Sequence, residues 1–246
     1  MKHRELWQPS KYVYRNGKLA ASRDHVEVGV GSRLMVDLVA GFYDRNLPIH
    51  AKGRLLDLGC GKVPLFAAYS KLVTDNICVD WGNSLHPNAY LDFECDITGS
   101  LPFKDGEFDT IILSDVLEHI PQPERLMADM ARMLSANGKL ILNVPFFYWI
   151  HERPHDYYRY TEFALRRFVD GAGLKLLQLD AIGGSPEALA DMLAKHLQFV
   201  PLLGTALAAC VQFVARVFVG TSFGGKISRK TAEGFPLGYF LVAEKS

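Results

Sequence analysis

Short apolar runs alternate with longer amphipathic stretches along the middle of the chain, from residue 53 to residue 144. Four runs have the near-continuous apolar character of strands that helices cover on both faces: RLLDLGC (54–60), NICVD (76–80), FDTIILSDV (108–116) and GKLILNVP (138–145). Strands that alternate with helices in this way are typical of βαβ units. The pattern therefore predicts an α/β fold with a doubly wound, mostly parallel sheet.

Helices are predicted where apolar residues recur three or four positions apart, in segments 31–46, 123–138 and 161–173. In the second segment such a stripe is formed by Leu126, Met130, Met133 and Leu134. Asn137 and Gly138 are a natural stop for this helix. We interpret the methionine stripe as part of the core.

The alternation continues through a strand at 174–183 and then breaks. An insert from Ser185 to about Gly234 precedes FPLGYFLVAEKS (235–246), whose apolar pattern predicts a last strand. We therefore predict one domain over residues 1–246. It would consist of an N-terminal arm (1–30), a core (31–184), a hydrophobic helical insertion or lid (185–234) and the last strand (235–246).

The composition excludes several classes of protein. The chain has 27 basic and 27 acidic residues, so no global charge attracts nucleic acid, and aromatic and basic residues are not interleaved. The first 23 residues carry six basic residues against one acid, a bias typical of a solvated arm. The four cysteines are scattered, and no apolar run follows the basic N-terminus. These features predict a cytoplasmic protein without nucleic-acid partners.

The first strand ends in a glycine loop that contains Asp57, Gly59, Cys60 and Gly61. Glycine lets the backbone turn tightly and approach a ligand where a side chain would collide. A carboxylate that leads the loop repels phosphate and attracts a cationic amino group. The loop is therefore a candidate site for a ligand that carries an ammonium group.

Further candidate ligand residues follow in the same βαβ series. Asp80 ends the next strand and can accept hydrogen bonds from both ribose hydroxyls of an adenosine group. Trp81 could stack on the adenine, and Asp96, beside Ile97, could accept a hydrogen bond from its amino group. Taken singly, an aspartate at the end of a strand is more often a turn or cap residue. Their order along the series favours a ligand site.

Several segments together resemble the class I S-adenosylmethionine-dependent methyltransferases, which have a Rossmann-like fold. The resemblance spans about residues 50–180 and rests on LLDLGCG, CVD, CDITGSLPFKDGEFDTIILSDVLEHI and the distal HERPHDYYRYT. The distal segment is similar to that of a bacterial methyltransferase subgroup of type 11. The resemblance also implies a final antiparallel strand.

The resemblance implies roles for single residues. The counterparts of Asp57, Gly59 and Gly61 hold the methionine part of S-adenosylmethionine, that of Asp80 the ribose and that of Asp96 the adenine. The segment from Ser114 to His119 resembles a motif that lines the methyl-transfer end of the pocket. The family commonly has a third glycine where this chain has Val63, which implies weaker cofactor binding or a stiffer loop.

The distal segment has two interpretations. His151, Glu152 and His155 fit H-E-x-x-H, the zinc motif of metallohydrolases, but Pro154 disfavours the helix that this motif requires. The favoured interpretation is a wall of the acceptor pocket, because the segment follows a strand at the carboxyl edge of the sheet. Its candidate substrate-binding residues are Glu152, Asp156, Tyr157, Tyr158, Arg159 and Tyr160. A structural network, with Asp156 paired to Arg159 and Thr161 capping the next helix, is the alternative.

Methyl transfer is an in-line displacement that requires positioning rather than a metal or a covalent intermediate. A hydroxyl acceptor also needs a base, and histidine is suited to this role near neutral pH. The candidates are His151, His155 and His119, with more weight on the distal pair.

Residues 199–219 are nearly all apolar and reach the length of a membrane span. A span would separate the last strand from its sheet, so we expect either a buried helix or a lid that touches lipid or an apolar acceptor. Lys226, Arg229 and Lys230 follow closely and suit an anionic membrane surface. The second interpretation predicts peripheral association with the inner face of the membrane.

The leading hypothesis is a methyltransferase that uses S-adenosylmethionine as its cofactor and methylates a small-molecule, sugar or lipid-linked acceptor. The distal segment favours a role in cell-envelope glycan or lipid chemistry. The alternatives are a non-catalytic module that binds S-adenosylmethionine or a nucleotide, and a zinc hydrolase that uses His151, Glu152 and His155.

Overall fold

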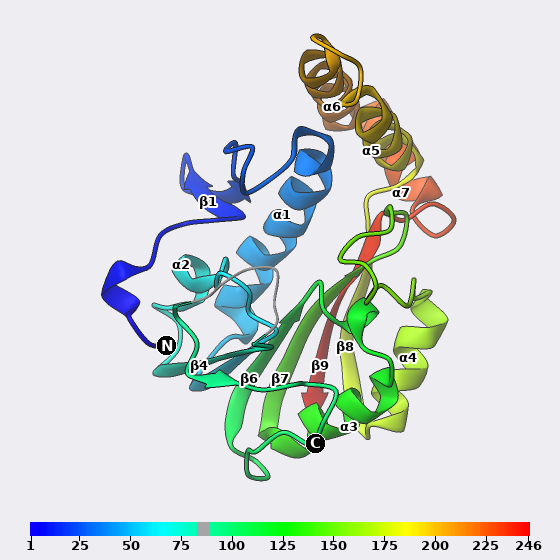
Figure 1. Ribbon diagram of the computed structural model, residues 1–246. Coiled ribbons are helices and arrows are strands. Elements are labelled where there is room, and N and C mark those ends of the chain that lie inside the picture. Colours follow the sequence, from blue (N-terminus) through cyan, green and yellow to red (C-terminus); the bar gives the residue numbers. More distant parts are fainter. Residues whose placement is uncertain (83–88) are drawn as a thin grey trace.

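The computed structural model describes residues 1–82 and 89–246 of the chain. Its centre is a seven-stranded sheet with the order β5-β4-β3-β6-β7-β9-β8 (Figure 1). The strands are β3 (Arg54–Leu58), β4 (Asp75–Asp80), β5 (Phe93–Glu94), β6 (Phe108–Ser114), β7 (Leu134–Pro145), β8 (Leu174–Ile182) and β9 (Gly238–Lys245). All neighbouring strands pair in parallel except β9, which is antiparallel to both β7 and β8. The predicted mostly parallel sheet with a final antiparallel strand is confirmed.

Helices cover both faces of this sheet, because its strands are apolar on both sides. On one face Leu55 packs in a cluster with residues of α1 (Arg33–His50) and α2 (Phe66–Tyr69). On the other face Leu56 and Leu58 pack in a cluster with residues of α3 (Pro123–Met133) and α4 (Glu162–Gly171). The doubly wound α/β prediction is confirmed.

The strand order places a switch point between β3 and β6. From β3 the chain proceeds outward to β4 and β5, and then returns to the other side of β3 to form β6 and β7. In an open α/β sheet, the crevice for ligands lies at the carboxyl ends of the strands at such a point. The loops after β3 and β6 therefore border the expected ligand site.

The N-terminal region is anchored to the core by a hairpin, although most of its basic side chains are exposed, as expected from its charge. After a short 3-10 helix, η1 (Arg4–Leu6), strands β1 (Tyr12–Arg15) and β2 (Lys18–Ala21) form a hairpin. Asn16 and Gly17 both have a positive φ, as the favoured two-residue hairpin turn requires. Tyr12 is buried, and the Ala21 N–H donates to Asp37 of α1 at 2.8 Å. The hairpin therefore places residues of the arm against the core.

The second predicted helix extends too far. Helix α3 ends at Met133, and Leu134 begins β7, where it pairs with Phe108 of β6. A register shift follows, and Asn137 has a left-handed backbone conformation. Leu134 is buried in either arrangement, so its apolar side chain could not show where the helix ends and the strand begins.

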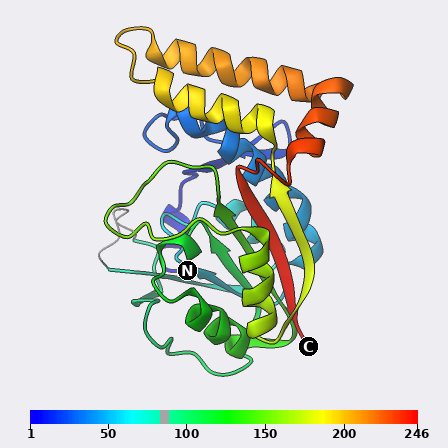
Figure 2. The same ribbon diagram turned by 90° about the vertical axis from the view of Figure 1, so that its right-hand side faces the viewer.

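Three helices form the predicted insertion between β8 and β9. Helices α5 (Ser185–Leu197) and α6 (Gly204–Gly220) lie side by side across the end of α1, and α7 (Ser222–Thr231) leads back to the sheet (Figure 2). Two more 3-10 helices, η2 (Val30–Ser32) and η3 (Leu117–His119), lie near this end of the sheet. Within the described part of the chain, no single helix has the length and hydropathy of a membrane span. Helices α6 and α7 together pass such a test but are bent by 97°.

Helix α6 is not an ordinary buried helix. Two of its polar residues contact the protein, since Gln212 is buried and Arg216 pairs with Asp37 of α1, whereas Thr205 is exposed. Its apolar side faces outward, and Phe213 is 66% exposed. Of the two interpretations of residues 199–219, the buried helix is wrong.

Candidate active site

The glycine loop follows β3 at the switch point of the sheet. Gly59 has φ +68°, and a Cβ atom there would lie 2.6 Å from a methyl carbon of Val116. The Gly59 and Cys60 N–H groups donate to the Val79 carbonyl of β4, at 2.8 and 3.1 Å. Gly61 has φ +49°, and no described atom lies within 4 Å of the place where its Cβ would be. Gly59 is therefore required by packing, whereas Gly61 leaves space for a close approach to the backbone.

Asp80 lies at the carboxyl end of β4, next to this loop. Its carboxylate accepts the Gly61 N–H at 2.6 Å and the Trp81 N–H at 2.7 Å. The Trp81 ring contacts the His155 ring edge to face, with centroids 5.3 Å apart. A carboxylate, a glycine that borders open space and an indole ring thus lie together, and this set fits the ribose and adenine of S-adenosylmethionine.

Asp57 lies below the loop in the core. Its carboxyl group is buried and accepts a hydrogen bond from the Tyr69 hydroxyl at 3.0 Å. Burial raises the pKa of Asp57 to about 7, against the lowering effect of the Tyr69 hydrogen bond. Asp57 therefore supports the loop from beneath, and its contact with a cofactor ammonium stays a prediction.

Three other predicted cofactor residues have partners within the protein. Asp96 accepts hydrogen bonds from the backbone and hydroxyl of Thr98, at 2.9 and 2.7 Å, and so closes a turn. Ile97 is buried in the core, which leaves only its backbone available to a ligand. The Ser114 hydroxyl donates to Asn143 at 2.9 Å. Direct side-chain contacts of Ile97 with the cofactor are therefore excluded.

A cavity of about 280 Å³, here called the polar cavity, lies at the carboxyl ends of β6 and β7. Lys11 and Asp115 line it and form an ion pair at 2.6 Å, and Asn143 donates to the other Asp115 oxygen at 2.6 Å. Although burial opposes its charge, Asp115 raises the pKa of Lys11 well above its usual value. Lys11 was not predicted from the sequence, because a charged N-terminus is more typical of a solvated arm. Asp115 could have been selected from the sequence, since it follows Ser114 in the segment that resembles the family's pocket-lining motif.

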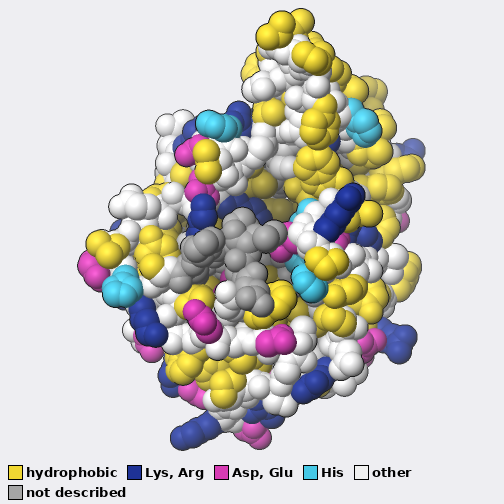
Figure 3. Space-filling model, viewed as in Figure 1, with side chains coloured by type: hydrophobic (Ala, Val, Ile, Leu, Met, Phe, Trp, Pro, Cys, Tyr) yellow, Lys and Arg dark blue, Asp and Glu magenta, His cyan; other side chains and the backbone are white. Residues whose placement is uncertain are grey.

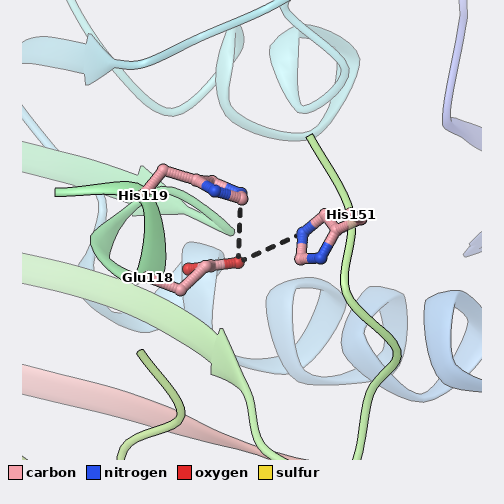
Figure 4. A group of neighbouring side chains, drawn as sticks. All are labelled: Glu118, His119 and His151. Carbon is pink, nitrogen blue, oxygen red and sulfur yellow. Dashed lines mark ion pairs between the residues drawn. The ribbon is translucent and has the colours of Figure 1, made fainter. Parts of the chain in front are cut away.

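Glu118, His119 and His151 form a group at the wall of the polar cavity (Figure 4). Glu118 Oε1 lies 3.7 Å from His119 Nε2 and 3.8 Å from His151 Nε2. Burial, with the charge of Asp115, raises the pKa of Glu118 well above its ordinary value. Burial and the neighbouring His119 lower the pKa of His151, which favours its neutral form. Two of the three predicted base candidates thus meet here, beside a glutamate that sequence analysis did not select.

His155 lies apart from this group. Its Nδ1 is 3.1 Å from the Tyr157 hydroxyl, and its ring faces Trp81. Residues 151–155 form turns rather than a helix, so the H-E-x-x-H motif does not present both imidazoles on one face. Among the described residues, the group with metal-ligand geometry contains His151 but neither Glu152 nor His155. The zinc site expected from H-E-x-x-H is therefore wrong.

The rest of the distal segment is held by a structural network. Arg159 forms a two-pronged ion pair with the buried Asp156 carboxylate, at 2.6 and 2.8 Å. Thr161 caps α4 by accepting the Ala164 N–H at 3.4 Å. Both contacts match the structural alternative for this segment.

The three tyrosines of this segment attach it to η3. The Tyr157 N–H donates to the Glu118 carbonyl at 3.0 Å, and the Tyr158 hydroxyl donates to the Pro121 carbonyl at 3.0 Å. Tyr160 is buried in the core and donates to the Leu117 carbonyl at 2.9 Å. A substrate-binding role for Tyr160 is therefore wrong, because its ring and its hydroxyl are both occupied by the protein.

A second cavity of about 280 Å³, here called the apolar cavity, lies between residues 146–149, which follow β7, and α5. Phe146, Phe147, Trp149, Met192 and Phe199 contribute most of its apolar lining. Tyr148 lines both cavities. At its rim the Lys195 ammonium pairs with buried Asp191 and lies 4.1 Å from the centre of the Tyr148 ring. The two cavities are therefore neighbours that share Tyr148 in their linings.

A family model described as a methyltransferase domain matches residues 31–179. The chain belongs to this methyltransferase family. The prediction of a methyltransferase is confirmed at the level of the family, and the matched residues include the glycine loop, Asp80 and the distal segment.

Relatives and solved structures agree with this methyltransferase assignment. Ubiquinone biosynthesis O-methyltransferase of Xanthomonas euvesicatoria is 28% identical over 103 residues, which cover 38% of this chain and 43% of that protein. The enzyme of the same name from Coxiella burnetii is 26% identical over 165 residues, 56% of this chain and 70% of that protein. A SAM-dependent methyltransferase from Archaeoglobus fulgidus superposes with a TM-score of 0.54 at 16% identity, covering 85% of this chain and 93% of its own. The cyclase SpnF superposes equally well, with a TM-score of 0.54 at 16% identity over 96% of this chain and 86% of its own. These superpositions show that the chain has the same fold as these proteins. A shared fold does not determine the reaction, which depends on the residues of the site.

Proposed function

We propose that this methyltransferase transfers a methyl group from S-adenosylmethionine to a hydroxyl oxygen of a lipid-linked acceptor at a membrane surface. One observation carries the proposal: the polar cavity at the carboxyl ends of β6 and β7 and the apolar cavity beside α5 share Tyr148 in their linings. A headgroup in the first and an apolar tail in the second would match the lining of each. The relatives' name, which specifies transfer to oxygen, supports the choice of acceptor atom.

Gly61, Asp80 and Trp81 are the residues that would hold the cofactor. When bound, S-adenosylmethionine supplies a methyl group on a positively charged sulfur. The Asp80 carboxylate is fixed by two backbone N–H groups, so it is oriented before any ligand arrives. Its negative charge also favours the cation over the neutral product.

The chain's own residues would position the acceptor and remove its proton. Lys11 and Asp115 present a fixed ion pair to the polar cavity. The Glu118, His119 and His151 group lies in the same wall and offers proton acceptors to a bound hydroxyl. The acceptor oxygen would take the methyl group, and the electrons of the carbon–sulfur bond would remain on sulfur. The hydroxyl proton would pass to the Glu118, His119 and His151 group.

Calorimetric titration of the full chain with S-adenosylmethionine and S-adenosylhomocysteine tests the cofactor site. We expect Asp80→Asn to weaken binding by about 10- to 100-fold, because a charge-assisted hydrogen bond contributes about 1.5–3 kcal/mol. Asp180→Asn is the matched control, since Asp180 is an exposed strand carboxylate on β8. A wild-type chain that binds neither compound would overturn the proposal.

The insertion supports a membrane-bound acceptor. Apolar side chains are exposed on α5, α6 and the turn between them, and Figure 3 shows several apolar patches on this protruding part of the molecule; the exposed residues include Leu189, Phe199, Leu202, Leu203, Phe213 and Val217. From residue 185 to residue 231 the only acids are Glu187 and Asp191, and both are buried. Over residues 185–231 the exposed surface is therefore apolar and basic, which suits an anionic bilayer, and the exposed acid Glu233 lies just beyond α7. Location on the inner face of a membrane and a role in the cell envelope stay predictions.

Flotation with vesicles tests the membrane contact. We expect the wild-type chain to float with vesicles of phosphatidylcholine and phosphatidylserine, and Phe213→Ser with Phe223→Ser to reduce binding at least tenfold, because each phenylalanine buries apolar area worth about 1.5–3 kcal/mol. Phe163→Ser is the matched control, since Phe163 is 73% exposed on α4. A wild-type chain that stays wholly in the soluble fraction would contradict the membrane proposal and leave the cofactor site untouched.

A further inference from the structure

Three hydrogen-bond acceptors converge at the wall of the polar cavity. Glu118 is fully buried, and neither of its carboxylate oxygens has a hydrogen-bond partner among the described residues. Its Oε1 lies 3.7 Å from His119 Nε2 and 3.8 Å from His151 Nε2 (Figure 4). Unpartnered buried acceptors are costly, so this arrangement calls for a ligand that supplies positive charge.

The contacts on the far side of each ring fix its tautomer. His119 Nδ1 lies 2.8 Å from the His155 carbonyl oxygen, which can only accept, so Nδ1 carries the proton. His151 Nδ1 lies 3.3 Å from both the Asp156 carboxylate and the Trp149 carbonyl, which are also acceptors. In the neutral rings both Nε2 atoms therefore direct lone pairs toward Glu118.

One proton cannot satisfy all three groups. A protonated Glu118 has one O–H and can donate to one imidazole, which leaves the other nitrogen without a donor. A cation with several coordination positions satisfies the carboxylate and both nitrogens together. Two imidazoles and a carboxylate are also a common ligand set for zinc and similar metals.

We infer that Glu118, His119 and His151 bind a divalent transition-metal ion, such as zinc, at the wall of the polar cavity. The Asp156 carboxylate and the His155 carbonyl would be the outer partners that orient the two imidazoles, as in known metal sites. Glu152, whose Oε2 lies 3.8 Å from His119 Nε2, borders the same cavity. This site differs from the one that the H-E-x-x-H spacing suggested, because Glu118 replaces Glu152 and His119 replaces His155.

The position of the ion suggests its role. Glu118, His151 and Glu152 all line the cavity, so a coordination position not taken by the protein would face the acceptor. A metal ion lowers the pKa of an oxygen that it holds, so with the ion bound the hydroxyl proton would leave to water in the cavity instead of to Glu118, His119 and His151, whose acceptor atoms the ion occupies. This role rests on the proposed function, whereas binding of the ion rests on the side-chain geometry alone.

Zinc binding by the full chain tests the site directly. After treatment with a chelator and dialysis, calorimetric titration with zinc should show one equivalent bound, and cobalt in its place should give visible absorption from a ligated ion. We expect His151→Ala and Glu118→Gln each to weaken zinc binding at least tenfold. The His155→Ala variant should bind as the wild type does, because it removes a neighbouring imidazole but keeps the carbonyl that orients His119.

Two outcomes would overturn the inference: a wild-type chain that binds no zinc, and loss of binding in His155→Ala equal to that in His151→Ala. Glu118 is fully buried and its replacement could unfold the chain, so the partly exposed His151 gives the decisive variant. Thermal unfolding of His151→Ala, compared with that of the wild type, shows whether this variant remains folded. Titration with S-adenosylmethionine in parallel separates the two proposals, since zinc binding without cofactor binding would retain this inference and remove the proposed function.

Discussion

Val63 is strained by its backbone conformation and held by its side chain. It has φ +53°, a left-handed conformation that β-branched residues rarely adopt, and its side chain is fully buried. Trp7 donates its indole N–H to the Val63 carbonyl at 3.1 Å, which fixes the peptide in place. The chain thus holds a left-handed backbone at this position without a glycine, because core packing offsets the strain.

A pair of substitutions separates strain from packing at Val63. Val63→Ala removes two buried methyl groups and keeps the strain, and we expect it to cost about 1–3 kcal/mol. Val63→Gly removes more buried surface but relieves about 1–2 kcal/mol of strain, so it should be no less stable than Val63→Ala. Urea unfolding of both variants measures this, and a glycine variant clearly less stable than the alanine variant would show that the strain is negligible.

Asp156 gives the distal segment a pH-dependent stability. Burial opposes its charge, but hydrogen bonds from Arg159 and from the His151 N–H lower the pKa of Asp156 to about 2, against an ordinary value of 3.8. A carboxyl group with a lowered folded-state pKa stabilises the fold above the unfolded-state pKa, and this stability is lost as the pH falls through the folded-state value.

Replacement of Asp156 should therefore matter most above pH 4. We expect Asp156→Asn to lower the free energy of unfolding by about 2 kcal/mol at pH 7, and by about half as much at pH 3. Urea unfolding from pH 7 to pH 3 measures the difference between the variant and the wild type. A difference that does not change over this range would mean that the carboxylate charge contributes nothing.

Single site residues were predictable to different degrees. Asp80 and Gly61 could be selected because their positions at strand ends and their chemistry point to the same ligand. Glu118 lies in the same 114–119 segment as Asp115 and could have been selected as a pocket residue, but a glutamate one residue before a histidine gives no sign of complete burial. Tyr160 was selected wrongly, since nothing in a polar, aromatic segment distinguishes a ring in the cavity from a ring in the core.

At the scale of elements, the inner strands were predictable because they are apolar on both faces, a pattern that few other structures share. The β1–β2 hairpin was missed because its strands are only four residues each, and its stability comes from contacts with α1. The orientation of α6 was missed for a related reason. Its Arg216 and Gln212 face Asp37 and the core, and only the tertiary structure reveals that partner.

Asp37 connects these two elements, so its removal should loosen both. The Asp37 carboxylate accepts the Ala21 N–H of the hairpin, and it pairs with Arg23 and with Arg216 of α6. We expect Asp37→Ala to cost about 2 kcal/mol of unfolding free energy and to speed proteolytic cleavage within α6.

Asp44 provides the control for this prediction, because it lies on the same helix and accepts the Leu19 N–H of the hairpin at 3.2 Å. Asp44→Ala should loosen the hairpin without exposing α6 to protease. Equal cleavage of α6 in the two variants would show that Arg216 does not hold this helix.

At the scale of the whole molecule, a net charge of zero conceals an uneven surface. Acidic residues equal basic ones in number, but over residues 185–231 both acids are buried, whereas Lys226, Arg229 and Lys230 are exposed, and the exposed Glu233 follows them. Composition alone excluded a global attraction to anionic surfaces and could not exclude a local one. The fold creates that local surface, because it buries Glu187 and Asp191 and exposes the apolar side of α6.

The local charge should make membrane binding depend on salt and on lipid charge. Each basic residue near an anionic surface contributes about 1 kcal/mol, so replacing Lys226, Arg229 and Lys230 with serine should weaken binding to phosphatidylserine vesicles by about 100-fold at low salt. Raising the salt concentration should also weaken wild-type binding, because salt screens the basic residues. The part of the binding that comes from the apolar surface should remain at high salt. A control variant with serine at Lys71, Lys104 and Arg167, exposed residues outside the insertion, carries the same change in net charge. If the control loses as much affinity as the first variant, binding follows the charge of the whole molecule and the insertion does not direct it.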